Sequence, residues 1–286
     1  MPPENEAIAL IQEAEKKATY KSWFGSSKLD EAAELYSRAA NKFQLGKKWK
    51  EAGDAFLRAA EIQLRMQEPD EAAGSFVNAS KAYKKTNAQD SVHSLEQAVA
   101  IYTDRGRFHI AAQHQKTIAE IYESDIQDYQ KALMAYQTAA DWYQSEESSA
   151  LANNCLLKVG TFAAQLEQYA VAIEKFEFVA SASVDNNLTK WSVREHLLKA
   201  GLCHLASEDI IAAKRALEKY QSMDVTFSST REFLFLKNLT DAVEAADEQL
   251  FTDTVYEFDR MTKLDAWKTT ILLRVKKTLG EPESIT

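Results

Sequence analysis

The feature that most constrains this chain is a phrase of 20 residues that recurs from Leu29 onward. Each copy contains a leading small residue. A residue that is usually large and apolar stands four positions after it, and another small residue stands seven positions after it. These offsets place all three side chains on one stripe of an α-helix. The leading small residues are Ala32, Ala52, Ala72, Ala112, Ala132, Ala152 and Ala172. The large residues are Tyr36, Phe56, Phe76, Tyr136, Leu156 and Phe176, and the trailing ones Ala39, Ala59, Ala79, Ala119, Ala139, Val159 and Val179.

Each copy is therefore expected to form one amphipathic helix of about 15 residues with a short turn, and two copies a hairpin of about 40 residues. Alanine lets neighbouring helices approach closely, while the large side chain fills the space above them. Such a hairpin buries its apolar face only by stacking on the next one. The repeat thus predicts an all-α chain built as a right-handed α-solenoid of TPR-like helix hairpins.

The expected helices follow the repeat, with turns at residues that start or stop helices. An amphipathic helix over 4–20 precedes helices near 28–46, 48–66, 69–86, 88–105, 107–123, 128–144, 147–166 and 168–181. The turn residues are Gly46, Pro69, Asn87, Gly106 and Asp125. The phrase fades after the polar segment 185–187. We therefore expect two domains: the helix hairpins over 1–187, and over 188–286 a C-terminal helical bundle with a flexible tail.

Composition excludes several classes of protein. Among 286 residues, only 8 Gly and 4 Pro interrupt helix, and no apolar run approaches the length of a membrane span. The first residues lack the basic and apolar regions of a signal peptide. A net charge of −9 argues against general nucleic-acid binding. Cys155 and Cys203 lie in apolar stretches, so we expect reduced core residues of a cytosolic protein rather than a disulfide.

The sequence offers no set of residues suited to catalysis. His109 and His114 are separated by roughly 140° around a helix, so they cannot share a metal as an i, i+4 pair could. There is no glycine-rich phosphate loop, and neither cysteine has an evident histidine partner. We expect a protein that is not an enzyme and that uses no cofactor or metal.

An aromatic pair, Trp23 and Phe24, stands in a break between helices and is flanked by Lys21 and Lys28. One interpretation is a loop whose aromatics fold back onto the first hairpin. The other is an interfacial anchor, because Trp and Phe favour the headgroup boundary and lysines suit anionic lipids. Two such side chains give only a weak, reversible attachment, roughly 1.5–3 kcal/mol each when buried.

Charges are segregated near the end of the chain. The segment 238–259 contains seven acidic residues and no Lys or Arg, whereas 260–277 contains six basic residues and one acidic residue. An acidic helix is often only a solvated face. Here the offsets of three and four residues are expected to place Asp241, Glu244 and Glu248 on one face, which suits a basic partner.

Together with the repeats, four segments carry a resemblance that covers nearly the whole chain: Ile101–Phe108, Ile118–Glu123, Cys155–Val159 and the final helix Leu264–Lys277. They are similar to the soluble NSF attachment protein family. The break at Trp23 also matches a membrane-touching loop of that family. The resemblance implies a non-enzymatic adaptor that binds the four-helix SNARE bundle left after vesicle fusion. It further implies recruitment of NSF, a hexameric ATPase that pulls the bundle apart.

The resemblance also implies roles for single residues. It predicts SNARE contacts at Lys84, Lys85, Arg107, Lys158, Lys190, Arg194 and Lys199. It predicts NSF contacts at Asp209, Asp241 and Glu244, stimulation of the ATPase by Ile285, and lipid contact by Trp23 and Phe24. Gln113 and Asn154 depart from the pattern, because they stand where relatives can have SNARE-contacting lysines. The implied protein is monomeric when free, cytoplasmic, and peripheral on vesicle and target membranes.

Two other functions fit a helical solenoid. A peptide-binding co-chaperone of the TPR class would use a 34-residue unit, whereas the unit here is about 40 residues. A passive vesicle-coat scaffold is the other alternative. Neither requires the aromatic break at Trp23 or an apolar residue at position 285.

Overall fold

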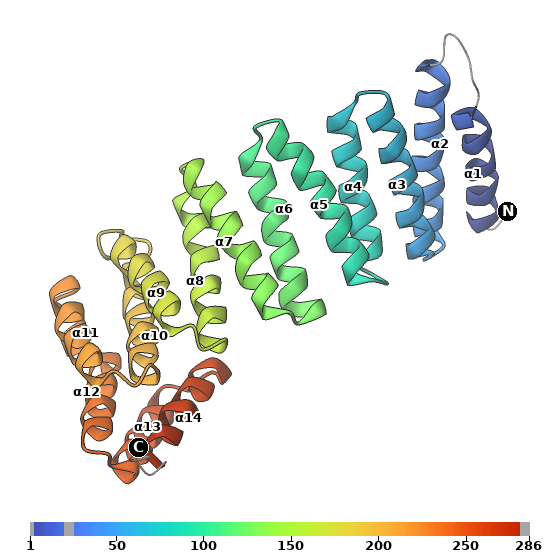
Figure 1. Ribbon diagram of the computed structural model, residues 1–286. Helices are drawn as coiled ribbons and strands as arrows, with labels where there is room; N and C mark the ends of the chain where they lie inside the picture. The colour runs from blue at the N-terminus through green and yellow to red at the C-terminus, as the bar shows by residue number, and fades with distance from the viewer. Residues whose placement is uncertain (1–2, 20–25, 281–286) are drawn as a thin grey trace, which may run out of the picture. The chain divides into compact units, whose positions relative to one another are not determined.

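The computed structural model describes residues 3–19 and 26–280, and this part of the chain folds into fourteen α-helices and three short irregular helices (Figure 1). The predicted all-α class is confirmed. The first nine α-helices are α1 (Pro3–Thr19), α2 (Ser26–Leu45), α3 (Trp49–Arg65), α4 (Pro69–Tyr83), α5 (Ala88–Asp104), α6 (Phe108–Ile121), α7 (Tyr129–Ser145), α8 (Ser149–Gln165) and α9 (Tyr169–Val184). The remaining five are α10 (Val193–Ala206), α11 (Ile210–Met223), α12 (Arg231–Glu244), α13 (Glu248–Met261) and α14 (Ala266–Gly280).

The chain divides into two compact units, Met1–Ala152 and Asn153–Thr286, so that α8 begins in the first and ends in the second. The polar segment 185–187 lies inside the second unit, between α9 and the 3-10 helix Lys190–Ser192. It is an irregular connection where the repeat fades. The expected boundary between 187 and 188 stays a prediction about folding domains.

The small and large residues of the repeat, which were predicted to share one stripe of each helix, form the surface through which the helices contact one another. All seven leading alanines are fully buried, and the trailing small residues are at most 2% exposed. The large residues between them are also buried, from Tyr36 in α2 to Phe176 in α9. In the first unit α2, α3 and α4 pack through Ala40, Ala52, Ala55 and Ala79, with Phe56 among them. The repeat register is therefore confirmed.

Most turns between repeat helices use a left-handed residue that is not glycine. Lys47, Gln67, Glu147 and Glu167 have φ values of 56°, 62°, 54° and 62°. The next amide then donates to the carbonyl five residues earlier, as from Lys48 N to Phe43 O at 2.9 Å. This pattern closes the helix in the manner of a Schellman motif. Gly106 has φ 69° as its position suggested, whereas at the Gly46 turn the left-handed residue is Lys47.

The connection from α6 to α7 departs from the repeat. The expected helix over 107–123 ends at Ile121, and a π-helix, η1 (Tyr122–Ile126), follows it. Gln127 then adopts φ 61°, and the Asp128 side chain caps α7 by accepting from Lys131 N at 3.0 Å. Asp125, expected to mark the turn, lies within η1 instead.

In the second unit α10 contacts α9, α11, α12 and α14. Gly201 allows the close approach of α12, because a Cβ there would lie 2.6 Å from Leu236 Cδ1. Cys155 and Cys203 are both buried and are not joined in a disulfide, as expected. Burial raises the pKa of the Cys203 thiol to about 12, so this thiol stays protonated at neutral pH.

Candidate interaction surfaces

Three of the predicted SNARE-contacting residues lie in the first unit, at helix ends. Lys84 and Lys85 are exposed where α4 ends, with Lys84 Nζ 3.9 Å from an Asp125 carboxylate oxygen. Arg107 is exposed at the start of α6. The lysines and Arg107 therefore lie at opposite ends of α5, about 25 Å apart by helix rise. A partner that touches both sets must span that distance.

Asp70, in the first turn of α4, holds the arginines of the α5–α6 turn. Its carboxylate lies 2.9 Å from Arg105 Nη2 and 3.3 Å from Arg107 Nη1. The Arg107 guanidinium is thus already paired within the chain. Sequence reasoning missed Asp70, since a carboxylate in a first helical turn reads as an ordinary helix-start residue.

The other four predicted basic residues lie in the second unit. Lys158 lies on α8 with its Nζ 5.9 Å from the Phe162 ring centroid. Lys190 is exposed in the 3-10 helix and donates to Asn187 Oδ1 at 3.0 Å. Arg194 is exposed in the first turn of α10, 3.7 Å from Glu232 of α12. These three present cationic groups at the surface.

Lys199 has a different environment. Its Nζ lies 5.7 Å from the Phe176 ring centroid and 5.4 Å from that of Trp267, and these two rings meet edge to face. Burial, together with nearby Lys268, lowers the pKa of Lys199, although Glu195 opposes that shift. The geometry therefore gives Lys199 a role in packing α10 against α9 and α14.

The two departures from the family pattern are both exposed polar residues, Gln113 on α6 and Asn154 on α8. Asn154 precedes Lys158 by one helical turn, so the two side chains share a face of α8. That face carries one cation fewer than a lysine at 154 would give.

The predicted NSF-contacting residues all lie in the second unit and are exposed. Asp209 is the N-cap of α11, where Oδ1 accepts from Ala212 N at 2.8 Å. Glu244, the last residue of α12, pairs with Lys214 of α11. Asp241 lies one turn earlier on α12.

The prediction that Asp241, Glu244 and Glu248 share one helix face is wrong. α12 ends at Glu244, and Ala246 reverses the chain with φ 50°. Asp247 then caps α13 by accepting from Leu250 N at 2.8 Å, so Glu248 begins a new helix. The acidic residues belong to two helices joined by a tight turn, which sequence spacing alone could not reveal.

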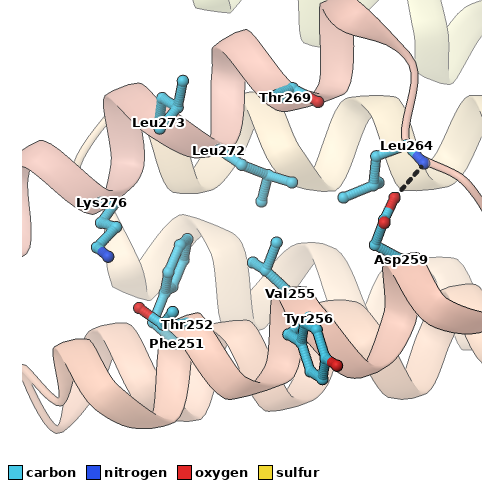
Figure 2. A pocket seen from close by; sticks show the side chains of 10 residues that line it. All are labelled: Phe251, Thr252, Val255, Tyr256, Asp259, Leu264, Thr269, Leu272, Leu273 and Lys276. Atoms are coloured by element: carbon cyan, nitrogen blue, oxygen red, sulfur yellow. Dashed lines mark hydrogen bonds between the residues drawn. The ribbon is translucent and has the colours of Figure 1, made fainter.

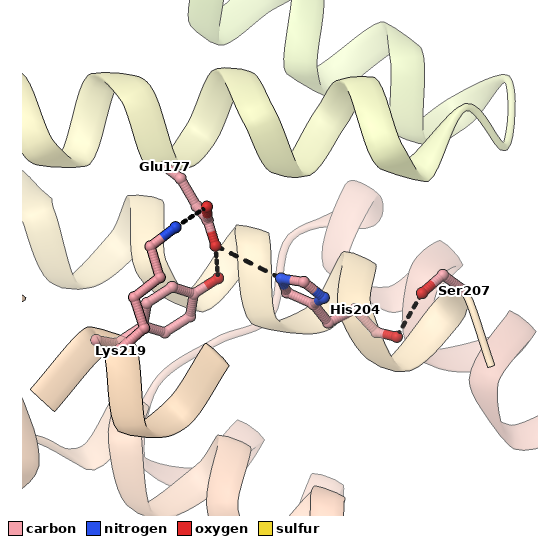
Figure 3. A network of polar contacts seen from close by, with 5 residues as sticks. Glu177, His204, Ser207 and Lys219 are labelled. Carbon is pink, nitrogen blue, oxygen red and sulfur yellow. Dashed lines mark hydrogen bonds and ion pairs between the residues drawn. The ribbon is translucent and has the colours of Figure 1, made fainter. Parts of the chain in front are cut away.

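A polar network that the sequence did not suggest joins α9, α10 and α11 (Figure 3). The Glu177 carboxylate accepts from Tyr220 Oη at 2.8 Å and from Lys219 Nζ at 2.5 Å, and it lies 3.5 Å from His204 Nε2. Burial raises the pKa of Glu177, but the hydrogen bonds from these three side chains outweigh burial and lower it to about 2. Glu177 is therefore ionised at neutral pH and ties the three helices together.

Two hollows lie on the second unit. An open hollow of about 490 Å³ is lined by the Glu177 network and by Asp209, with Arg215 and Lys219 on its wall. Asp209 thus shares this hollow with two cationic side chains. A second hollow, of about 450 Å³ between α13 and α14, is mostly apolar and is lined by Phe251, Val255, Leu264, Leu272 and Leu273 (Figure 2).

Trp23, Phe24 and Ile285 lie outside the described residues, as does the tail 281–286. Their predicted contacts with lipid and with the ATPase are therefore carried by sequence alone. None of the helices in 3–19 and 26–280 combines the length and apolar character that a membrane crossing requires.

The fold and its charged surfaces define a TPR-like helical-repeat protein whose basic and acidic residues lie at helix ends and on helix faces. A solved structure with this fold is a signal-transduction ATPase with a tetratricopeptide repeat sensor from Pyrococcus horikoshii. It aligns with a TM-score of 0.51 at 15% identity, covering 96% of this chain and 44% of that one. At this identity the match supports the fold alone.

The chain belongs to the soluble NSF attachment protein family, whose model, "Soluble NSF attachment protein, SNAP", matches residues 5–280. It is 45% identical to the beta-soluble NSF attachment protein of Bos taurus, over 96% of this chain and 94% of that protein. It is also 45% identical to the alpha-soluble NSF attachment protein of Mus musculus, over 98% and 97%. The probable vesicular-fusion protein sec17 homolog of Schizosaccharomyces pombe is likewise 45% identical, over 96% of each chain.

Proposed function

We propose that this chain is an adaptor that binds the post-fusion SNARE four-helix bundle and recruits an NSF-type hexameric ATPase to it in vesicle transport. The observation that carries the proposal is the 45% identity, along nearly the whole chain, to proteins named soluble NSF attachment proteins and vesicular-fusion protein. The two alternative functions, a peptide-binding co-chaperone and a coat scaffold, are disfavoured by the same match. The adaptor acts without a catalytic site or cofactor.

The basic residues supply the SNARE side of the proposal. We take the SNARE four-helix bundle to be an acidic rod. It would contact Lys84, Lys85 and Arg107 in one unit, and Lys158, Lys190 and Arg194 in the other. The partner must span the separation of about 25 Å along α5. Opposite charges on the two surfaces would speed encounter and fix the register of the rod. Lys199 contributes by holding α10.

The acidic residues supply the motor side. Asp241, Glu244 and the capping Asp209 lie on folded elements, so they would bind a basic domain with little loss of conformational freedom. Glu244 must exchange its partner Lys214 for a cation of the ATPase. We assign recruitment of the ATPase to this acidic surface.

The remaining roles fall on residues known only from sequence. Trp23 and Phe24 would insert at the membrane surface, a weak contact that gains from simultaneous binding to a membrane-anchored bundle. Ile285 would stimulate ATP hydrolysis once the acidic surface has brought the motor close. The adaptor is monomeric when free and works in the cytoplasm, peripherally on vesicle and target membranes.

A pull-down tests the proposal. An immobilised SNARE bundle should retain NSF in the presence of non-hydrolysed ATP only when this chain is added. Changing Asp209, Asp241 and Glu244 to lysine should abolish NSF retention but leave the chain on the bundle. Retention of NSF without the chain, or failure of the chain to bind the bundle, would refute the adaptor function.

A further inference from the structure

The last helix, α14, is tied to the end of α8 by side chains more than 100 residues away in sequence. Trp267 Nε1 donates to Thr161 O at 3.0 Å. Arg274 donates through Nη1 to Ala164 O at 2.7 Å and through Nη2 to Gln165 O at 2.8 Å. The Arg274 guanidinium also lies 3.6 Å from Glu167, the left-handed residue of the α8–α9 turn.

The two Arg274 bonds reach carbonyls in the last turn of α8, at Ala164, which also accepts from Glu167 N at 3.1 Å, and at Gln165, whereas Thr161 O lies one turn earlier. The last four carbonyls of an α-helix have no intrahelical donor, and a cation at that end also interacts favourably with the helix dipole. Arg274 supplies both a donor fork and a positive charge. It therefore acts as a C-terminal cap of α8 provided by another helix.

α14 also fixes α10. Lys268, only 8% exposed, lies 2.6 Å from Glu195 of α10 and 2.8 Å from Asp265. Trp267 packs edge to face against Phe176 at 5.7 Å between ring centroids, and Lys199 of α10 lies over both rings. One short stretch of α14 thus contacts three helices of the second unit.

The contact points lie beside the predicted SNARE-binding cations. Thr161, which accepts from Trp267, follows Lys158 by one turn of α8. Glu195, which binds Lys268, is adjacent to Arg194 on α10. α14 therefore contacts both helices that carry Lys158 and Arg194, although it contributes neither cation.

We infer that Trp267 and Arg274 are positioning residues that hold Lys158 on α8 and Arg194 on α10 at a fixed spacing for a rigid acidic partner. The inference rests on the proposed SNARE binding and adds residues that do not touch the partner. A rigid rod binds best to cations that are already spaced to match it. A flexible polyanion adapts to any spacing and is insensitive to it.

The test compares a rigid and a flexible polyanion in the full chain. Arg274→Met with Trp267→Phe removes the donors to α8 while retaining most apolar area. We expect affinity for a SNARE four-helix bundle to fall about tenfold and affinity for poly-glutamate to change less than twofold. The matched control is Lys277→Met, which removes an exposed cation one turn further along α14. It should lower both affinities slightly and equally.

Hydrogen exchange gives a readout that does not depend on the partner. Amides of the α8–α9 turn, residues 166–168, should exchange faster after Arg274→Met and unchanged after Lys277→Met. Equal losses for the rod and for poly-glutamate, or unchanged exchange in the turn, would overturn the inference. If the wild-type chain binds no SNARE bundle, the proposed function fails, while the exchange result still decides whether Arg274 holds α8.

Discussion

The two compact units of this chain are stabilised by different means. In Met1–Ala152 most helices meet through alanines that recur every 20 residues, so that most crossings resemble one another. In Asn153–Thr286 the later helices are joined by contacts that occur once: the Glu177 network, the Phe176–Trp267 pair and the Arg274 cap. The comparison teaches that a repeated pattern specifies a stack of hairpins, whereas ending the stack requires individual, longer-range contacts.

The largest expected effect tests a contact that occurs once. Phe176→Ala should lower the free energy of unfolding by about 3–5 kcal/mol, because Phe176 is fully buried and supports both Trp267 and Lys199. The control on the same helix is Phe178→Ala, since Phe178 is 50% exposed. Denaturant unfolding of both variants measures the difference. Similar losses for the two phenylalanines would contradict the role given to the aromatic pair.

The next effect concerns pH and the Glu177 network. The pKa of Glu177 is lowered from its ordinary value of 4.5 to about 2 in the folded chain. The ionised carboxylate therefore stabilises the fold at pH values above its ordinary pKa. That contribution, about 2–3 kcal/mol, is lost as pH falls from about 5 to 2. Glu177→Gln should therefore flatten the decline in stability over this range. Glu174→Gln, an exposed change on the same helix, should leave the profile unaltered.

Overpacking tests the repeated region. Ala59→Leu should lower the free energy of unfolding by about 1–3 kcal/mol, because Ala59 is fully buried at a helix crossing. Ala100→Leu places the same side chain at an exposed position of α5 and should have little effect. Melting temperatures of the two variants decide the matter. An unshifted melting temperature for Ala59→Leu would break the repeat register.

A smaller expected effect, on SNARE-bundle affinity, tests whether both units contact the same partner. Arg107→Glu and Lys158→Glu together should weaken SNARE-bundle binding about tenfold, or about 1.4 kcal/mol, and make the residual binding less sensitive to salt. Lys237→Glu, the same reversal at an exposed site on α12, is the control. Binding titrations at two salt concentrations measure both effects. If only one of the two reversals matters, the partner docks on one unit.

The smallest expected effect concerns the tail. Ile285→Ala should lower stimulated ATP hydrolysis severalfold and leave NSF recruitment unchanged, because burial of one such side chain gains only about 1.5–3 kcal/mol. Co-sedimentation and hydrolysis rates measured side by side test this division. A tail variant that fails to recruit NSF would show that recruitment is not confined to the acidic surface.

The sequence predicted the repeated part of the fold well because one physical rule governs it. An alanine recurs at most of the 20-residue steps and marks the helix crossings, so the helices and their buried residues could be read from the repeat, apart from the departure at η1. The turns were harder to predict, since residues such as Lys47 and Glu167 adopt left-handed backbone without being glycine.

The candidate surfaces were less predictable, because they depend on residues distant in sequence. Nothing near Arg107 indicates that Asp70 will pair with it. Spacing cannot show that the chain reverses at Ala246, which separates Glu248 from Asp241. The aromatic environment of Lys199 likewise requires Trp267 of α14, so only the fold shows that this lysine is half-buried.

The most direct test of the adaptor account is SNARE disassembly measured by fluorescence, with NSF and ATP supplied and this chain varied. The account predicts rapid disassembly with the wild-type chain. It predicts disassembly slowed about tenfold at limiting chain concentration with Arg107→Glu and Lys158→Glu combined, and almost none without the chain or with Asp209, Asp241 and Glu244 changed to lysine. Disassembly that proceeds equally well with both charge-reversed variants, or that the wild-type chain fails to support, would contradict the account.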